Sequence, residues 1–437
     1  MRRINRAIGA SNLIAYYPIV VDRASGAKLY DIDGKEYMDF NASWTAAGAG
    51  YSDPQVIRAI ESELRKSLGV STSSFPTRVV LDLAEKLIKI TPGTFSKKVW
   101  LGHSGSDAAG AVFKLLPLTT KRPRMISFFG SMHGIDLAGI EMAGHPATTK
   151  YPVPTIATKV PYAYCYRCPF GLEYPSCGIY CASSFIEEHV FKTVNPPEDT
   201  SFMIVEPIQS DAGDIVPPDG YFEKLKKTCE KFGILFVTDE VKVGMGRTGK
   251  MFGIEHSSVI PDAIILGKSL ASGLPLSALI TKTELLDTGF AVSTLGGNTI
   301  SAAAGIATID LIEKRGIAKN AERVGNYLLK RLRELQAKHD LIGDVRGRGL
   351  IAGLELVNDR KTKEPAKKEA IKLVYRSWQL GLLVVFLGIN SNVVEITPPL
   401  AIGNNEVDLA VEILDKALSD VEAGRVSDSA VEGYTGF

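Results

Sequence analysis

Short apolar segments alternate with helical ones between residues 97 and 282, and this alternation constrains the fold more than any other feature. Such a pattern is typical of an α/β domain, in which helices cover a largely parallel sheet. Loops at the carboxyl ends of the strands form the binding crevice of such sheets. We therefore expect the site residues directly after the apolar segments, which read KKVWLG, RMISFF, SFMIVEP, ILFVTDE, AIILGK and LSALIT.

One lysine, Lys268, follows such a segment after a single glycine. An amine at that place is partly removed from water, which lowers its pKa and favours a Schiff base with a carbonyl cofactor. A second segment of the same kind ends at Asp239. Pyridoxal phosphate requires a lysine for its aldehyde and a carboxylate that keeps its pyridine nitrogen protonated. Together, Lys268 and Asp239 predict an enzyme that uses pyridoxal 5′-phosphate.

A glycine and a serine, Gly105 and Ser106, lie between the first apolar segment and an alanine-rich helix expected over 108–116. Backbone N–H groups and a hydroxyl at a helix start can bind a phosphate, and the helix dipole strengthens the interaction. Serine and aspartate are also ordinary N-caps, so this turn alone is a weak signal for a phosphate site.

Composition excludes few functions but sets the scale of the molecule. The 437 residues carry a net charge of +1 and are 45% hydrophobic, which gives no indication of binding to nucleic acid or to an anionic membrane. A chain of this length is expected to form more than one core. Neither an apolar signal region nor an apolar run of about 20 residues is present, so we expect a cytoplasmic protein.

We expect three parts. Residues 1–50 pack with a small domain, residues 51–320 form the large cofactor-binding domain with an insertion over 161–190, and residues 321–437 form the small domain. Helical spacing and apolar runs further predict helices over 54–68, 76–90, 221–232, 300–314, 321–339 and 366–380, and strands over 346–355 and 393–400.

Four of the five cysteines lie in the insertion, at Cys165, Cys168, Cys177 and Cys181. Their C-x2-C and C-x3-C spacing is compatible with zinc, with an iron–sulfur centre or with disulfides, and spacing alone does not separate these options. The chemistry at Lys268 requires no metal, so we interpret the segment as a structural insertion.

Several motifs in order resemble the class III aminotransferase family, pyridoxal-phosphate enzymes of fold type I, over about residues 9–415. These motifs are SGSDA, GSMHG, EPIQSDAG, TDEVKVGMGRTG, LGKSLASGLPLSA and TLGGN. The resemblance implies an α/β large domain with a mostly parallel central sheet and a smaller α+β domain.

The resemblance also implies roles for single residues. Lys268 would bind the cofactor's aldehyde, Asp239 would pair with the pyridinium, and Gly105 and Ser106 would hold the phosphate. Thr294 would reach the phosphate of a neighbouring subunit, which implies a homodimer, or a tetramer built from dimers, with shared active sites.

Further roles concern the ring and the substrate. Met132 and His133 would contact the cofactor, Met132 at a position where the family commonly has a tyrosine or phenylalanine stacked on the ring. Trp44 and Tyr17 would line the substrate pocket.

Three departures from the family pattern bear on the reaction. Lys242 replaces a glutamine near the cofactor's phenolic oxygen, Asp211 replaces a glutamate, and Glu395 stands where many members have an arginine. We expect Asp211 and Glu395 to face each other, so that like charges raise the pKa of one carboxyl. Such a carboxyl could both accept and donate a proton near neutral pH.

With these three residues, the sequence resembles α-amino-ε-caprolactam racemase and related amino-acid racemases and epimerases more than it resembles ornithine or 4-aminobutyrate aminotransferases. We expect a two-base racemase in which Lys268 and Asp211 exchange the α-proton on opposite faces. Lys242 would stabilise the phenolate, and Glu395 would tune Asp211. The substrate would be an amino acid, amino-acid amide or lactam, and Arg348 or backbone groups could hold a free carboxylate.

Two alternatives remain. One is an aminotransferase that uses 2-oxoglutarate or pyruvate as acceptor. The other is a catalytically silent relative that acts as a metal-bearing interaction protein.

Overall fold

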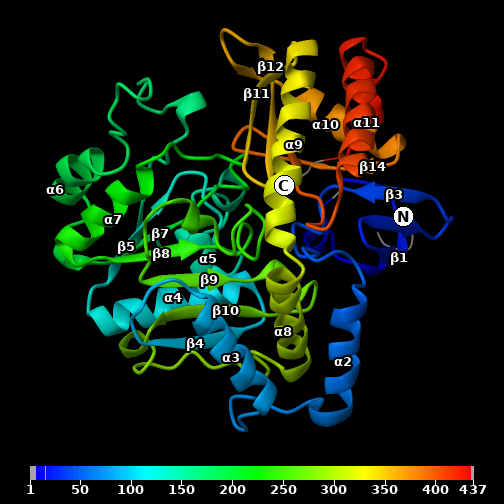
Figure 1. Ribbon diagram of the computed structural model, residues 1–437. Helices are drawn as coiled ribbons and strands as arrows, with labels where there is room; N and C mark the ends of the chain where they lie inside the picture. The colour runs from blue at the N-terminus through cyan, green and yellow to red at the C-terminus, as the bar shows by residue number, and fades with distance from the viewer. Residues whose placement is uncertain (1–5, 15, 435–437) are drawn as a thin grey trace.

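The computed structural model describes residues 6–14 and 16–434. Figure 1 shows a central sheet flanked by helices, with smaller sheets beside it. The seven strands of the central sheet are, in spatial order, β4 (Lys97–Gly102), β10 (Ser277–Lys282), β9 (Ala263–Leu266), β8 (Leu235–Asp239), β7 (Thr200–Val205), β5 (Arg124–Phe128) and β6 (Ala157–Val160).

All six predicted strands of this sheet are confirmed, and β6 was missed. β6 is an edge strand of four residues with Thr158 and Lys159 in its middle, so its sequence has no apolar run. β10 is antiparallel to both of its neighbours, whereas β9, β8, β7, β5 and β6 pair in parallel. The carboxyl ends of the parallel strands therefore meet at one edge, as predicted.

The central sheet is buried on both faces. Along β9, Ile264 and Leu266 belong to one hydrophobic cluster, and Ala263 and Ile265 belong to another, because successive side chains of a strand point to opposite faces. The second cluster contains the apolar residues of α4 (Gly105–Thr120). The first contains those of α7 (Tyr221–Phe232) and α8 (Thr299–Lys314).

The remaining helices of this region agree closely with the sequence pattern. α2 (Pro54–Ser67) and α3 (Arg78–Ile90) both pack against α8. α4 begins three residues earlier than expected, at Gly105, because Ser104 accepts a hydrogen bond from the backbone of Asp107 and caps the helix. The other two helices are the short α5 (Leu137–Met142) and α6 (Phe191–Thr193).

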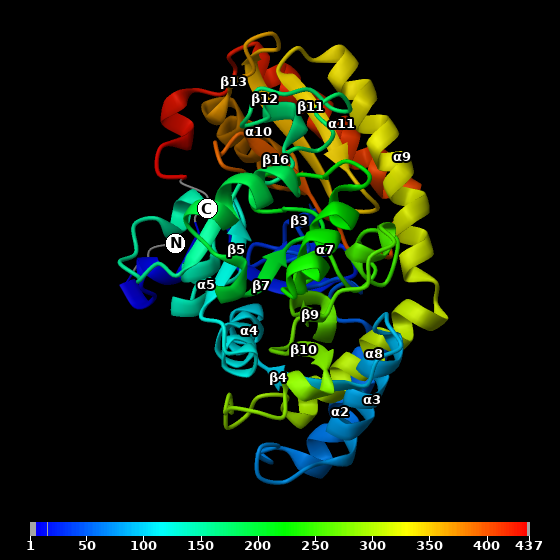
Figure 2. The ribbon, with the colours of Figure 1, turned by 90° about the vertical axis from the view of Figure 1, so that its left-hand side faces the viewer.

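Figures 1 and 2 show α9 (Ile317–Lys338) as a long helix that leads from α8 to the smaller C-terminal sheet. That sheet has the order β11-β12-β16-β15, with β13 paired to β12, and α10 and α11 pack against each other beside it. The bounds are β11 (Ile342–Gly347), β12 (Ala352–Asp359), β13 (Glu364–Pro365), α10 (Lys367–Gln379), β15 (Val385–Leu387), β16 (Val393–Ile396) and α11 (Asn404–Glu422).

The strand predicted over 346–355 is in fact the end of β11 and the start of β12, joined by a turn. Gly349 has a φ of +60° there, a conformation that glycine adopts without strain. The sequence RGRG marks this turn, and the strand prediction overlooked it.

The chain's beginning pairs with a segment from near its end. β1 (Val21–Ser25), β2 (Lys28–Asp31) and β3 (Glu36–Asp39) form an antiparallel sheet, which β14 (Leu382–Leu383) extends in parallel to β3. The boundaries drawn at residues 50 and 320 stay a prediction. Within the described ranges, every helix is too short or too polar to cross a membrane.

Candidate active site

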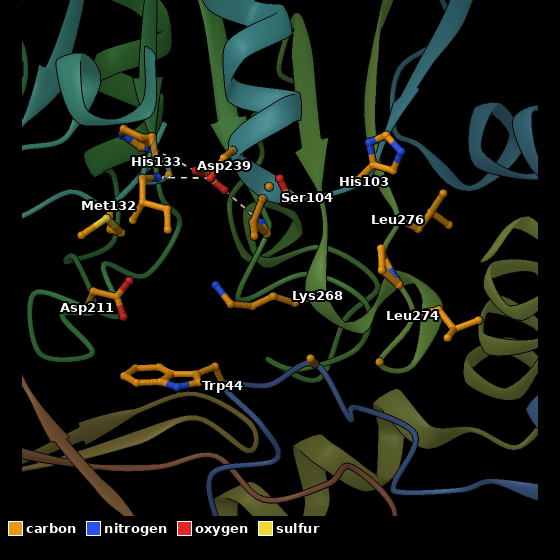
Figure 3. A pocket seen from close by; sticks show the side chains of 18 of the residues that line it. Trp44, His103, Ser104, Met132, His133, Asp211, Asp239, Lys268, Leu274 and Leu276 are labelled. Atoms are coloured by element: carbon orange, nitrogen blue, oxygen red, sulfur yellow. Dashed lines mark hydrogen bonds and ion pairs between the residues drawn. The ribbon is translucent and has the colours of Figure 1, made fainter. Parts of the chain in front are cut away.

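A cavity of about 630 Å³ opens where the loops after β4, β5, β7, β8 and β9 meet (Figure 3). Its walls combine a few charged groups with apolar side chains such as Ile14 and Leu276. Eight of the residues predicted for the site line this one cavity: Trp44, Gly105, Ser106, Met132, His133, Asp211, Asp239 and Lys268.

Lys268 enters the cavity from the loop after β9. Its φ of +39° is unusual for a residue with a side chain, and such conformations are concentrated at functional sites. Figure 3 shows no hydrogen bond or ion pair from its amine to the described residues drawn there. Burial lowers the pKa of Lys268; the charge of Asp211 works against this, and the charge of Lys242 adds to it. The amine is therefore available for a covalent bond to a carbonyl group.

Asp239 lies at the end of β8, where its side chain is oriented by two contacts. Its Oδ2 atom is 2.8 Å from Nδ1 of His133, and its Oδ1 atom accepts a hydrogen bond from the backbone of Val241 at 3.0 Å. Only 4% of Asp239 is exposed. A buried carboxylate with a fixed orientation is the group that a protonated ring nitrogen requires.

The start of α4 forms a narrow cradle beside these groups. A Cβ atom on Gly105 would lie 2.7 Å from Cγ1 of Val241, and one on Gly134 would lie 2.6 Å from Oγ of Ser106. Only glycine permits these approaches. The free backbone N–H groups of a helix start and the hydroxyl of Ser106 suit a phosphate, so the residues present fit pyridoxal 5′-phosphate.

Lys242 bridges the two acidic residues that the sequence singled out. Its Nζ atom lies 2.9 Å from Oδ1 of Asp211 and 2.7 Å from Oε1 of Glu395. The two carboxylates thus lie near each other, but the expectation that their like charges dominate is wrong, because both contact the ammonium of Lys242. Lys242 comes from the loop after β8, and this reach between segments was not visible in the sequence.

The expectation that like charges raise the pKa of one carboxyl of this pair is not met at Asp211. Burial works to raise it, but the ammonium groups of Lys242 and Lys268 outweigh burial and hold the pKa of Asp211 below its usual value. Burial works to lower the pKa of Lys242, yet the charges of Asp211 and Glu395 raise it. The pair is therefore ionised.

A third carboxyl, that of Asp214, has a raised pKa, which was expected for Asp211 or Glu395. Burial raises it, and the charge of Glu395 adds to the effect. The hydroxyl of Ser210 lies 2.8 Å from Oδ1 of Asp214 and 2.7 Å from Oε1 of Glu395. The single hydroxyl hydrogen of Ser210 can be donated to only one of these two carboxyls at a time. Sequence reasoning missed Ser210 and Asp214, although Ser210 lies in the motif EPIQSDAG and Asp214 directly follows it.

Glu206 was quoted in a motif but given no role. Its carboxylate accepts a hydrogen bond from the backbone of Met132 at 2.9 Å. Burial raises the pKa of Glu206, as do the nearby charges of Asp239 and Asp211. This residue thus holds the loop after β5 in place beside the cavity.

Trp44 and Tyr17 differ in their positions. Trp44 lines the cavity, and the Nζ atom of Lys242 lies 5.0 Å from its ring centroid. Tyr17 does not belong to the lining, and its hydroxyl donates to the carbonyl of Val384. Tyr16 stands between the two, with its ring 5.8 Å from that of Trp44. The role of Tyr17 in binding substrate stays a prediction.

Two further predicted residues lie outside the cavity of this chain. The carbonyl of Thr294 accepts a hydrogen bond from Ser71 at 2.8 Å, and its role toward a neighbouring subunit stays a prediction. Arg348 lines a separate cavity of about 270 Å³ together with His256 and Glu223. The suggestion that Arg348 holds a substrate carboxylate in the active site is wrong for this structure.

The four cysteines of the segment 161–190, which was predicted to be an insertion, line a cavity of only about 20 Å³ and are all free thiols. Burial raises the pKa of Cys181 to about 12, and the other three thiols contribute. Over residues 6–14 and 16–434, no three histidine, cysteine, aspartate or glutamate side chains are arranged to hold a metal ion.

Comparison with known proteins adds evidence that is independent of this geometry. The profile of the family described as aminotransferase class-III matches residues 11–418. A leucine/methionine racemase of Thermococcus litoralis is 38% identical over 100% of this chain and 99% of its own length. An isoleucine 2-epimerase of Lentilactobacillus buchneri is 37% identical over 99% of this chain and 97% of its own length.

An alanine/serine racemase of Pyrococcus horikoshii is 36% identical over 96% of this chain and 89% of its own length. Among solved structures, an aminotransferase of Bacillus anthracis superposes with a TM-score of 0.88 at 26% identity, over 96% of this chain and 97% of that one.

Proposed function

Because the chain belongs to the class III aminotransferase family and has its fold, we propose that it is a pyridoxal-phosphate-dependent racemase or epimerase of amino acids. The relatives named as racemases and as an epimerase support this reaction, since each is similar over most of its length. The sequence motifs imply that the chain binds pyridoxal 5′-phosphate in the manner of fold-type-I enzymes.

One observation carries the proposal. Figure 3 shows the amine of Lys268 and the carboxylate of Asp211 pointing toward one another across the same cavity. The two side chains come from the loops after β9 and β7. Inversion at a carbon atom is done most directly by one acid/base on each face, and both groups can exchange protons.

The cofactor would be held by residues that the geometry brings together. When bound, pyridoxal 5′-phosphate serves as an electron sink for negative charge at the α-carbon. Lys268 would hold its aldehyde, and Asp239 would keep its ring nitrogen protonated. Gly105 and Ser106 would bind its phosphate, while Met132 and His133 would line its ring.

Protons then move between the protein and the α-carbon. In one direction the ionised Asp211 removes the α-proton from one face, and the protonated amine of Lys268 delivers a proton to the other face. In the reverse direction the neutral amine of Lys268 removes the α-proton, and Asp211 delivers the proton that it accepted in the forward direction. Lys242 keeps Asp211 ionised and ready to accept a proton, and Glu395 holds the same ammonium group in place. In this proposal Lys242 acts on Asp211, besides its predicted place near the phenolic oxygen.

We infer that the substrate has a neutral side chain. Ile14, Leu274, Leu276 and Trp44 give the cavity apolar walls, and the amino acids in the names of the relatives are uncharged in their side chains. Amides and lactams of amino acids are included, because Glu395 stands where many members of the family have an arginine that can bind a carboxylate.

The test is chiral analysis in deuterated water without any keto acid. A panel of neutral amino acids, amides and lactams should show inversion together with deuterium at the α-carbon. Lys268→Ala should lower the rate by about 10²- to 10⁴-fold. Amino transfer to 2-oxoglutarate or pyruvate, with no inversion in its absence, would instead favour the aminotransferase alternative.

We also infer a homodimer or a tetramer of dimers with shared sites, in which Thr294 of one subunit reaches the phosphate site of the next. Light scattering gives the assembly. In a mixture of Lys268→Ala and Thr294→Val subunits, recovery of part of the activity would support shared sites.

A further inference from the structure

The loop over residues 210–214, which carries Asp211, is held from outside the cavity by an arginine of β11. Both Nε and a terminal nitrogen of Arg346 donate to the carbonyl of Gly213, at 2.7 Å and 2.5 Å. Arg346 is not part of the cavity lining. Its contact with the loop lies two residues away from Asp211.

The approach of Arg346 depends on the absence of a side chain at position 213. Gly213 has a φ of +122°, and a Cβ atom there would lie 3.0 Å from the terminal nitrogen of Arg346 and 3.0 Å from Cγ2 of Val393. On the neighbouring residues, the backbone N–H groups of Gly388 and Ile389 donate to the carbonyls of residues 211 and 212. Three successive carbonyls of the loop are therefore bound, and Arg346 binds the third.

Arg346 is itself fixed by acidic residues of the same sheet. Its guanidinium lies 2.6 Å from Oε2 of Glu355 and 2.8 Å from Oδ2 of Asp344. Glu355 is fully buried and also accepts hydrogen bonds from Tyr164 and Arg167 of the insertion. The insertion over 161–190 is thus connected to the loop of Asp211 through Glu355 and Arg346.

On the basis of the proposed function, we propose that Arg346 is a positioning residue for Asp211, and that it thereby controls only one of the two faces of proton transfer. The physical reason is geometric, since a displacement of about 1 Å at a reacting group can cost about 10²-fold in rate. Lys268 is carried by a different loop, so its proton transfer should not depend on Arg346.

The experiment compares two rates for each enantiomer in deuterated water: α-hydrogen exchange with retention, and inversion. The test variants are Arg346→Lys, which keeps a positive charge beside Glu355, and Gly213→Ala, which moves the guanidinium away. Asp211→Asn defines the signature of a lost second base. The control is Arg360→Lys, because Arg360 likewise donates to backbone carbonyls, those of residues 336, 339, 340 and 342.

We expect inversion by Arg346→Lys and Gly213→Ala to fall about 10- to 100-fold. For the enantiomer whose α-hydrogen faces Lys268, the rate of exchange with retention should stay within about twofold of the wild-type rate. Asp211→Asn should show the same pattern. Arg360→Lys should have wild-type rates of both exchange and inversion. Equal loss of exchange and inversion, or no loss, would overturn the role of Arg346. Absence of inversion in the wild type would overturn the proposed function itself. Circular dichroism of each variant identifies any that fails to fold, and the other variant then decides.

Discussion

The amino group of Lys242 lies 2.9 Å from the carboxylate of Asp211. Two carboxylates that faced each other directly would raise the pKa of one of them. The ammonium of Lys242 has the opposite effect, because it stabilises the ionised form of Asp211. In the proposed reaction, Asp211 therefore begins each turnover as a base when it faces the α-hydrogen.

Replacing Lys242 by glutamine should move the acidic limb of the pH profile. Burial raises the pKa of Asp211, but the charges of Lys242 and Lys268 lower it by more. Loss of Lys242 should therefore raise the pKa of Asp211. The ionised base is present only above that pKa, and activity should therefore fall at a higher pH than in the wild type. The measurement is kcat/KM for inversion over a pH range that begins below 3.8, the ordinary pKa of an aspartate, and extends to neutral pH.

Lys226→Gln is the matched control for this prediction, because Lys226 pairs with Asp262 outside the cavity at 2.8 Å. Its pH profile should be that of the wild type. An acidic limb that does not move in Lys242→Gln would refute the electrostatic role of Lys242.

Glu240 should make the folded protein less stable as the pH rises. Burial raises the pKa of Glu240 from 4.5 to about 8, so the folded state binds the proton more tightly than the unfolded state. Between pH 4.5 and pH 8 the unfolded state binds fewer protons, and stability declines by up to about 1.4 kcal/mol per pH unit. Glu240→Gln should remove this part of the slope.

Urea unfolding at pH 5 and pH 8 measures the difference in slope between Glu240→Gln and the wild type. Glu240 also accepts hydrogen bonds from the backbones of Gly253 and Ile254, so the variant should lose stability at both pH values. Glu198→Gln, at an exposed position, serves as control. A slope that is the same in Glu240→Gln and wild type would contradict the assignment.

Gly325→Ala should destabilise the protein, although alanine is the better helix former by about 1 kcal/mol. Gly325 lies in α9, where an added Cβ atom would be 2.0 Å from the carbonyl oxygen of Gly349 and 2.5 Å from its Cα atom. These are backbone atoms, so a relief of the clash moves α9 away from the turn between β11 and β12. We expect a loss of at least about 2 kcal/mol.

Thermal unfolding compares this variant with Gly110→Ala in α4, where the nearest atom to the added Cβ is a carboxylate oxygen of Asp136 at 3.2 Å. The α4 variant should unfold near the wild-type temperature. Equal stability of the two variants would show that α9 does not need its close contact with residue 349.

Met132→Phe should strengthen the retention of the cofactor. Met132 lines the cavity, and an aromatic ring at the predicted stacking position adds about 0.5–1.5 kcal/mol. The dissociation constant of pyridoxal 5′-phosphate should therefore fall about 2- to 10-fold, measured by equilibrium dialysis of the apoenzyme. Met125→Leu, in the core of the sheet, should leave it unchanged, and weaker binding by Met132→Phe would contradict the stacking prediction.

Much of the fold and of the cofactor site could be predicted from the sequence because the relevant signals are local. Asp239 is the last residue of β8, Lys268 lies two residues after β9, and Gly105 lies three residues after β4. Parallel strands bring their carboxyl ends together. Edge strand β6 and the turn between β11 and β12 were missed because short or glycine-rich segments carry little periodicity.

The sequence by itself determined which residues stand at the strand ends and, through its motifs, the family to which the chain belongs. Only the tertiary structure decided what those residues do to one another. Lys242 lies between Asp211 and Glu395, and Arg346 binds the loop of Asp211, although these residues come from distant segments. The sign of a pKa shift depends on which charge is nearest in space, and side-chain reach between segments is set by packing, which no local pattern records.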